Sequence, residues 1–184
     1  MPKVVLVVGH SAQVQGAAGV PPLEPEYTYN MDLAQWIQDT LTSLGVSSEI
    51  VTRNLVGIAG AYHKVNLLKP ALAIELHYNS FNGRTRGTET LYSSRHPRSE
   101  ALAQVIQQAM CKALNRKPEQ DRGIKKLKAG DRGSLNVSLA DCPSVLVEPF
   151  FGDHIDDARI GRERRIDLAK AIAEAVRDFL DEKI

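Results

Sequence analysis

Short, strongly apolar runs alternate with longer segments of helical periodicity along almost the whole chain. The run at residues 4–8 (Val-Val-Leu-Val-Val) has no polar residue, which is typical of a strand buried on both faces of a sheet. Similar runs occur at 46–51, 71–76 and 144–147, and segments of helical spacing lie between them. Strands that alternate with helices predict one α/β layered domain over residues 1–184, with a mostly parallel sheet.

The remaining elements are predicted from the same two patterns. Apolar residues at helical spacing predict helices over 33–44, 58–68, 102–114 and 166–180, with Gly45 ending the first and Ser99 capping the third. A fourth strand is expected at 87–92, and two short strands are expected near Ile124 and Leu135 in the polar, basic stretch 115–142.

Composition excludes several classes of protein. Lys and Arg number 23 against 22 Asp and Glu, and only 5% of the 184 residues are aromatic, so nucleic-acid binding has little support. The longest apolar run is too short to span a bilayer, so no stable membrane insertion is expected. The first residues do not resemble a secretory signal, which predicts that the chain is made in the cytoplasm and first stays there. Cys111 and Cys142 are then expected to be free thiols.

Polar residues follow three of the predicted strands directly. His10 follows the first run, His77 follows the third, and Glu148 ends the last one. Ligands bind beyond the carboxyl ends of strands in an open parallel sheet, so these three side chains are expected at one edge. A single histidine of this kind is more often structural, but three such residues at strand ends indicate a site.

Two imidazoles and a carboxylate are the ligand set of a catalytic zinc ion that keeps a fourth position open. Zinc-dependent hydrolysis also needs a carboxylate that is not a ligand, because the attacking water must lose a proton. Glu148 supplies one acidic candidate, and Glu24 and Glu26 in the loop before the first helix supply the other. These residue types alone leave open which carboxylate binds the metal.

The order of these residues resembles that of the zinc-dependent N-acetylmuramoyl-L-alanine amidases of the Amidase_3 family. The resemblance extends from about residue 3 to residue 180. It is carried by Gly9-His10-Ser11, Glu26 with Asn30, Leu76-His77-Tyr78-Asn79-Ser80 and the stretch 143–151, with support from Thr52-Arg53, Asn66, Gly87-Thr88-Glu89 and Arg122-Gly123-Ile124-Lys125.

The resemblance implies a phosphorylase/hydrolase-like three-layer α/β/α sandwich. It also implies zinc held by His10, Glu26 and His77, Glu148 as the catalytic base, and cleavage of the amide between N-acetylmuramic acid and L-alanine in peptidoglycan. Glu26 fits the family pattern because Asn30 and a helix follow it, and Glu24 is the alternative third ligand.

The residues after Glu148, Pro149-Phe150-Phe151-Gly152-Asp153, resemble those of bacteriophage endolysins within the family. The sequence departs from the usual family pattern at Val8 and Ser11, which flank Gly9-His10. The resemblance implies a lysis enzyme whose partner is peptidoglycan, and we expect the protein to be a monomer. Such an enzyme would act on the cell wall after its release by a separate membrane-permeabilising protein.

Two further residues are candidates for supporting roles. Glu75 lies two positions before His77, so on a strand its side chain shares a face with that histidine; it either orients the imidazole or pairs with a basic residue. Asn79, with Ser80, either binds substrate or forms a turn. The lysines at 125, 126 and 128 either meet the anionic wall polymer or are simply solvated.

Two other functions fit part of this pattern. A zinc carboxypeptidase would use the same ligand chemistry on another bond of the stem peptide, but it needs an arginine to clamp a terminal carboxylate, and the sequence identifies none. A catalytically silent wall-binding domain could retain the fold, although it would have no need of all four polar residues.

Overall fold

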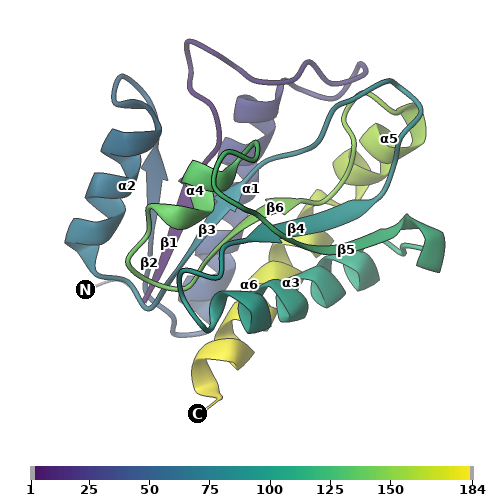
Figure 1. Ribbon diagram of the computed structural model, residues 1–184. Helices are drawn as coiled ribbons and strands as arrows, with labels where there is room; N and C mark the ends of the chain where they lie inside the picture. Colours follow the sequence, from purple (N-terminus) through teal and green to yellow (C-terminus); the bar gives the residue numbers. More distant parts are fainter. Residues whose placement is uncertain (1–2, 183–184) are drawn as a thin grey trace.

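Six strands form one sheet in an order that differs from their order along the chain. The computed structural model describes residues 3–182. The sheet order is β2-β1-β3-β6-β4-β5 (Figure 1). The strands are β1 (Val4–Val8), β2 (Ser48–Thr52), β3 (Leu72–Leu76), β4 (Thr88–Tyr92), β5 (Asp121–Lys126) and β6 (Ser144–Glu148). All neighbours are parallel except β4 and β6, which are antiparallel, so the predicted mostly parallel sheet is confirmed.

Helices cover both faces of this sheet. The long helices α1 (Glu26–Ser43), α3 (Ser99–Ala113) and α6 (Arg165–Asp181) pack together on one face, and α2 (Gly57–Leu68) and α4 (Ser134–Ser138) lie on the other. A short 3-10 helix, η1 (Pro118–Gln120), precedes β5, and α5 (Ile155–Glu163) follows β6. The predicted three-layer α/β/α sandwich is therefore confirmed.

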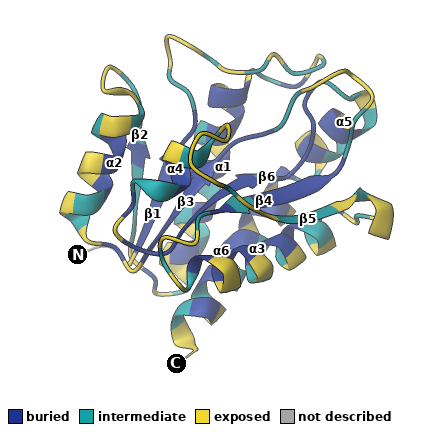
Figure 2. Ribbon diagram, viewed as in Figure 1, coloured by how far each residue is buried: buried dark blue, intermediate teal, exposed yellow. Residues whose placement is uncertain are grey.

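Strand β1 is buried on both sides, as its sequence predicts. Val4, Leu6 and Val8 face the larger core formed with α1, α3 and α6, whereas Val5 and Val7 face the smaller core under α2. Strands β1 and β3 are buried along their whole length, and Figure 2 shows the exposed residues on the outer helix faces and in the loops. The central strands thus give the site a rigid base.

Two local predictions were wrong. The segment around Leu135 is the single helical turn α4 rather than a strand, because Gly133 has a positive φ of 83° and its carbonyl accepts the Asn136 N–H, which starts a turn. Leu135 is exposed there, while Asn136 is buried. Ser99 does not cap α3 either; it is the first helical residue, and its hydroxyl accepts the Ser144 N–H instead.

Two other features agree with the sequence. The strand expected near Ile124 is β5, and both cysteines are free. In the described range 3–182, no helix has both the length and the apolar character that crossing a membrane would require.

Candidate metal centre

The carboxyl ends of β1, β3 and β6 lie side by side, as predicted. Val8 is paired with Leu76, and Leu76 is paired with Val147, so His10, His77 and Glu148 all lie at one edge of the sheet. The His77 N–H also donates to the Val147 carbonyl, at 3.2 Å. The sheet register therefore brings together residues that are far apart in the sequence.

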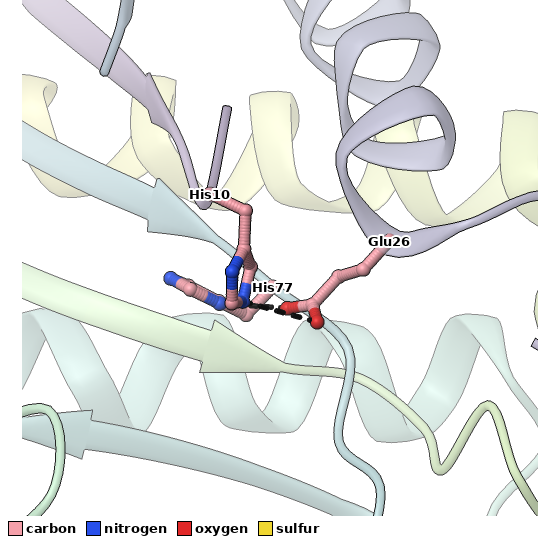
Figure 3. A group of neighbouring side chains, drawn as sticks. All are labelled: His10, Glu26 and His77. Carbon is pink, nitrogen blue, oxygen red and sulfur yellow. Dashed lines mark hydrogen bonds and ion pairs between the residues drawn. The ribbon is translucent and has the colours of Figure 1, made fainter. Parts of the chain in front are cut away.

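The Glu26 carboxylate faces both histidines from the start of α1 (Figure 3). Its Oε1 is 2.7 Å from His77 Nδ1 and its Oε2 is 3.2 Å from His10 Nε2. The imidazole rings of His10 and His77 have centroids 5.1 Å apart. One ligand atom from each of the three residues lies within 4.8 Å of the others, so this group can hold a metal ion. The donor set of two imidazoles and one carboxylate fits zinc.

The backbone around the histidines is adapted to this close approach. His10 has a positive φ of 63°, which is uncommon for a non-glycine residue and is found at functional sites. A Cβ atom at Gly9 would lie 2.7 Å from His77 Nδ1, and one at Gly16 would lie 2.6 Å from Glu26 Oε2. Residues without side chains at 9 and 16 therefore leave room for the three candidate ligands.

The structure distinguishes between the two acidic candidates: Glu24 lies in the loop before α1, as expected, whereas Glu26 is the first residue of the helix. Glu26 is buried in the first turn of α1, where its carboxylate also accepts the N–H groups of Ala17 and Tyr78. Glu24 is partly exposed and forms an ion pair with Arg165 instead. Only Glu26 is brought to the histidines, as the resemblance implies.

The Glu26–His77 pair has strongly altered proton affinities. Burial favours the neutral carboxyl, but hydrogen bonds from His10 and His77 outweigh it and lower the pKa of Glu26 to about 2. Burial favours the neutral imidazole of His77 in the same way, but Glu26 and Glu75 outweigh it and raise the pKa of His77 to about 10. Without a metal, a proton on His77 holds this group together.

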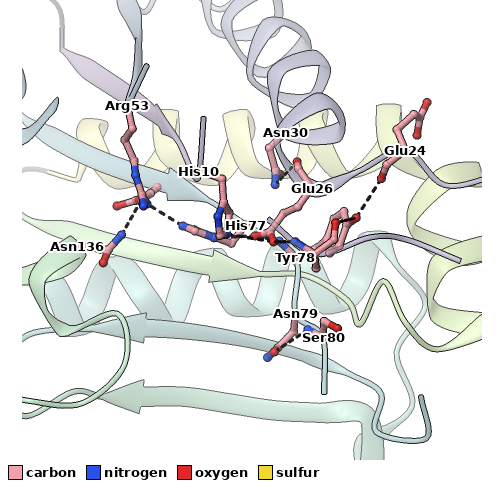
Figure 4. Close-up of polar contacts among 12 residues, drawn as sticks. His10, Glu24, Glu26, Asn30, Arg53, His77, Tyr78, Asn79, Ser80 and Asn136 are labelled. Atoms are coloured by element: carbon pink, nitrogen blue, oxygen red, sulfur yellow. Dashed lines mark hydrogen bonds and ion pairs between the residues drawn. The ribbon is translucent and has the colours of Figure 1, made fainter. Parts of the chain in front are cut away.

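Glu75 is fully buried on β3 and contacts four side chains. Two of the residues that contact it, Arg53 and Asn136, are labelled close together beside His77 in Figure 4. Its Oε1 accepts hydrogen bonds from Arg53 at 2.8 Å and Asn136 at 2.7 Å, and it lies 3.1 Å from His77 Nε2. Tyr62 donates to Oε2 at 2.7 Å. Glu75 thus contacts both the imidazole and a basic residue, so the two roles expected from the sequence coexist.

Glu148 lies beside the group but is not part of it. Its Oε2 is buried and has no hydrogen-bond partner in the described part of the chain. Removal from water raises the pKa of Glu148 to about 8; the charge on His77 lowers it, and the nearby carboxylates of Glu26 and Glu89 raise it. An unpartnered carboxyl group beside a possible metal site is free to exchange a proton with a bound water.

Sequence reasoning missed one wall of the site. Asn79 donates to Glu89 Oε1 at 2.8 Å, and Arg122 Nε donates to Glu89 Oε2 at 2.7 Å. The side-chain oxygen Oδ1 of Asn79 accepts a hydrogen bond from the Ser80 N–H. Glu89 and Arg122 belong to motifs that the sequence analysis noted, but their contact depends on the pairing of β4 with β5 and β6, which the sequence does not reveal.

Two further histidines and the lysines at 125, 126 and 128 lie away from the group. His63 is exposed on α2, and His154 caps the start of α5. Lys125, Lys126 and Lys128 are exposed on and just after β5, which is an edge strand. Lysines at such an edge discourage pairing with another sheet.

Taken together, the α/β/α fold and a His-Glu-His group beside a free carboxyl group are typical of a metal-dependent hydrolase. Comparison with protein families gives a match to the N-acetylmuramoyl-L-alanine amidase family Amidase_3 over residues 4–178. The chain therefore belongs to this family of peptidoglycan amidases. No curated protein matched in a sequence search.

Several solved structures have the same fold. The catalytic domain of the amidase CwlV from Bacillus (Paenibacillus) polymyxa var. colistinus has a TM-score of 0.82 and 24% identity, with 98% of this chain and 99% of that chain covered. An amidase from Clostridium difficile 630 has a TM-score of 0.84 and 20% identity, covering 100% and 99%. The catalytic domain of the endolysin CD27L, which targets Clostridia difficile, has a TM-score of 0.78 and 25% identity, covering 100% and 99%.

Proposed function

We propose that this protein is a zinc-dependent amidase that hydrolyses the bond between N-acetylmuramic acid and L-alanine in peptidoglycan. One observation carries the proposal: two histidines and a carboxylate converge within ligand distance, and Glu148 lies beside them with an unpartnered carboxyl oxygen. A wall-binding domain without activity would gain nothing from this costly burial of charge.

The contacts of each side chain indicate which atom would hold the metal. Nε2 of His77 faces Glu75, so Nδ1 is the donor atom, and Nε2 is the donor atom of His10. Zinc held by these atoms and the Glu26 carboxylate would polarise the scissile carbonyl and lower the pKa of a water to about 7. Glu75 fixes the tautomer of His77, since it accepts the Nε2 proton.

Glu148 is the proposed base. Its carboxylate accepts a proton from the attacking water and returns it to the nitrogen of the leaving L-alanine. A divalent cation beside it favours the ionised form, which opposes the effect of burial. The same carboxyl group can therefore work near neutral pH as acceptor first and donor second.

The biological role that we propose is lysis of a bacterial cell wall by a monomeric enzyme. The residues after Glu148 and the similarity to an endolysin catalytic domain support this role. In this proposal the enzyme reaches the wall after another protein has permeabilised the membrane.

Mass spectrometry of digested peptidoglycan tests the reaction. The zinc-loaded protein should release free stem peptides that begin with L-alanine, and a chelator should stop the release. Trimmed peptides still joined to muramic acid would instead support a carboxypeptidase. Wall sedimentation with the protein but no product of either kind would support a silent binding domain.

A further inference from the structure

A second polar group adjoins the proposed catalytic residues on the side of β4 and β5. Glu89 on β4 is paired with Glu148 on β6, and opposite residues in antiparallel strands have their side chains on the same face. Arg122 binds Glu89, and Asn79, two residues after His77, binds the other oxygen of Glu89. This group is therefore continuous with the candidate metal centre.

An irregularity in β5 sets the position of Arg122. The register between β4 and β5 shifts between Thr88 and Thr90, and Gly123 has a positive φ of 71°, so the strand bulges at the residues facing Glu89. Bulges redirect side chains and are common next to active sites. Here the guanidinium of Arg122 lies over the Phe151 ring, 5.1 Å from its centroid.

The guanidinium is fixed on one side and available on the other. Arg122 donates from Nε to Glu89, and this is the only hydrogen bond of its side chain within residues 3–182. The Arg122 side chain is 35% exposed, whereas that of Glu89 is 12% exposed. An arginine held by a carboxylate and an aromatic ring keeps its two Nη groups oriented, and this fork matches the geometry of a carboxylate.

We propose that Arg122 binds a carboxylate of the stem peptide and so favours substrates that carry this charge close to the cleaved bond. The inference rests on the proposed amidase reaction. L-alanine in the stem peptide is followed by a glutamyl residue joined through its side-chain carboxyl, which leaves the main-chain carboxylate free two residues from muramic acid. In some walls this group is an amide. An amide has one acceptor oxygen and a donor nitrogen, so it cannot accept one hydrogen bond from each Nη group as a carboxylate can.

Kinetics on two matched soluble muropeptides test this proposal. The substrates differ only in whether that glutamyl group is a carboxylate or an amide, and the zinc-loaded enzyme is compared with Arg122→Gln and Arg122→Lys. For the wild type, KM should be lower for the carboxylate. Arg122→Gln should raise KM for the carboxylate about tenfold or more, with kcat nearly unchanged and little effect on the amide. Arg122→Lys should be intermediate, because it keeps the charge but not the fork.

Arg95→Gln is the control, since Arg95 is exposed beyond the opposite end of β4 and should not alter the ratio of the two KM values. Equal KM values for the two substrates in the wild type, or a preference that persists in Arg122→Gln, would overturn the inference while leaving the amidase intact. Absence of turnover on both substrates would instead contradict the proposed function, and the inference would fall with it.

Discussion

Glu89 and Glu148 lie directly opposite each other on the antiparallel strands β4 and β6, yet their surroundings differ. Glu89 accepts hydrogen bonds from Asn79 and Arg122, whereas Glu148 has a buried oxygen without a partner. The partnered carboxylate is held as part of the site wall, and the unpartnered one is available for proton transfer. This difference is the basis for assigning the base to Glu148.

Replacing Glu148 by Gln should abolish most turnover and leave zinc binding intact. The amide cannot accept a proton from water, so kcat should fall by about 100-fold to 10,000-fold. Muropeptide kinetics and zinc content of the purified variant measure the two effects. Glu119→Gln, at an exposed position in η1, should behave like the wild type. Near-normal kcat in Glu148→Gln would show that another group is the base.

The two acidic residues before α1 provide a matched pair of substitutions. Glu26→Gln should greatly weaken zinc binding because it removes the charged ligand between His10 and His77. Glu24→Gln should retain zinc, since Glu24 contacts Arg165. Titration of the metal-free proteins with zinc gives both affinities. Weaker binding in Glu24→Gln than in Glu26→Gln would reverse the assignment.

Glu75→Gln should impair both stability and metal affinity. The substitution leaves the Arg53 guanidinium without its charged partner, which should lower the free energy of unfolding by about 3 kcal/mol. It also replaces the charged acceptor that orients His77 by a weaker, neutral one, and losses in zinc affinity of about 10-fold to 100-fold are typical when such a partner is changed. Urea unfolding and zinc titration measure these effects. The exposed pair Glu49–Lys64 is the comparison, and Glu49→Gln should change stability by less than about 1 kcal/mol.

Gly9→Ala should disturb the metal centre through a single methyl group. The added Cβ would overlap the His77 ring and displace it from Glu26, so zinc affinity should fall. Gly45→Ala is the control: its Cβ would meet no atom within 4 Å, but its positive φ of 75° makes the substitution strained. Gly45→Ala should therefore lower Tm without weakening zinc binding. Equal zinc affinity in both variants would show that His77 tolerates the overlap.

The metal-free protein should lose stability as the pH rises from about 5 to 10. The pKa of His77 is raised to about 10, so its protonated imidazole stabilises the folded protein fully below pH 6.5, its ordinary pKa. This stabilisation is lost as the pH rises from 6.5 to 10. The pKa of Glu148 is raised to about 8, so its burial costs stability once the carboxyl would ionise in the unfolded chain. This loss of stability grows as the pH rises from 4.5, the ordinary pKa, to about 8. The pKa of Glu26 is lowered to about 2, so its ionised carboxylate stabilises the fold fully above pH 4.5. This stabilisation is lost as the pH falls toward 2.

Urea unfolding with chelator present, at a series of pH values, measures this dependence. In Glu148→Gln the decline between pH 5 and 8 should be shallower, because one of the titrating groups is gone. Zinc affinity should increase over the same range, since the metal displaces the proton on His77. A stability of the metal-free protein that rises from pH 6 to 9 would contradict these assignments.

The sheet and the positions of the candidate ligands could be predicted because they depend on local pattern. The apolar runs before His10, His77 and Glu148 place these residues at strand ends. Because β1, β3 and β6 are parallel neighbours, these ends lie side by side at one edge of the sheet. The choice of Glu26 over Glu24 needed the family resemblance, since the sequence pattern places both in one predicted loop. The structure then separated them by their contacts.

The parts that were missed depend on contacts between distant segments. Asn136 reaches Glu75 from α4, a single helical turn after Gly133 that stands where the sequence predicts a short strand near Leu135. The wall formed by Glu89 and Arg122 requires that β4 runs antiparallel to β6. No local pattern indicates strand direction, so this wall is visible only in three dimensions.

The place of β6 in the sheet has a consequence for the timing of activity. This strand lies next to β3 in the interior of the sheet, although it is the last strand to be made by the ribosome. A nascent chain that already contains both histidines still lacks Glu148, and β3 and β4 cannot join into one sheet without it. Under the proposed function, the domain therefore cannot turn over its substrate until β6 has been made.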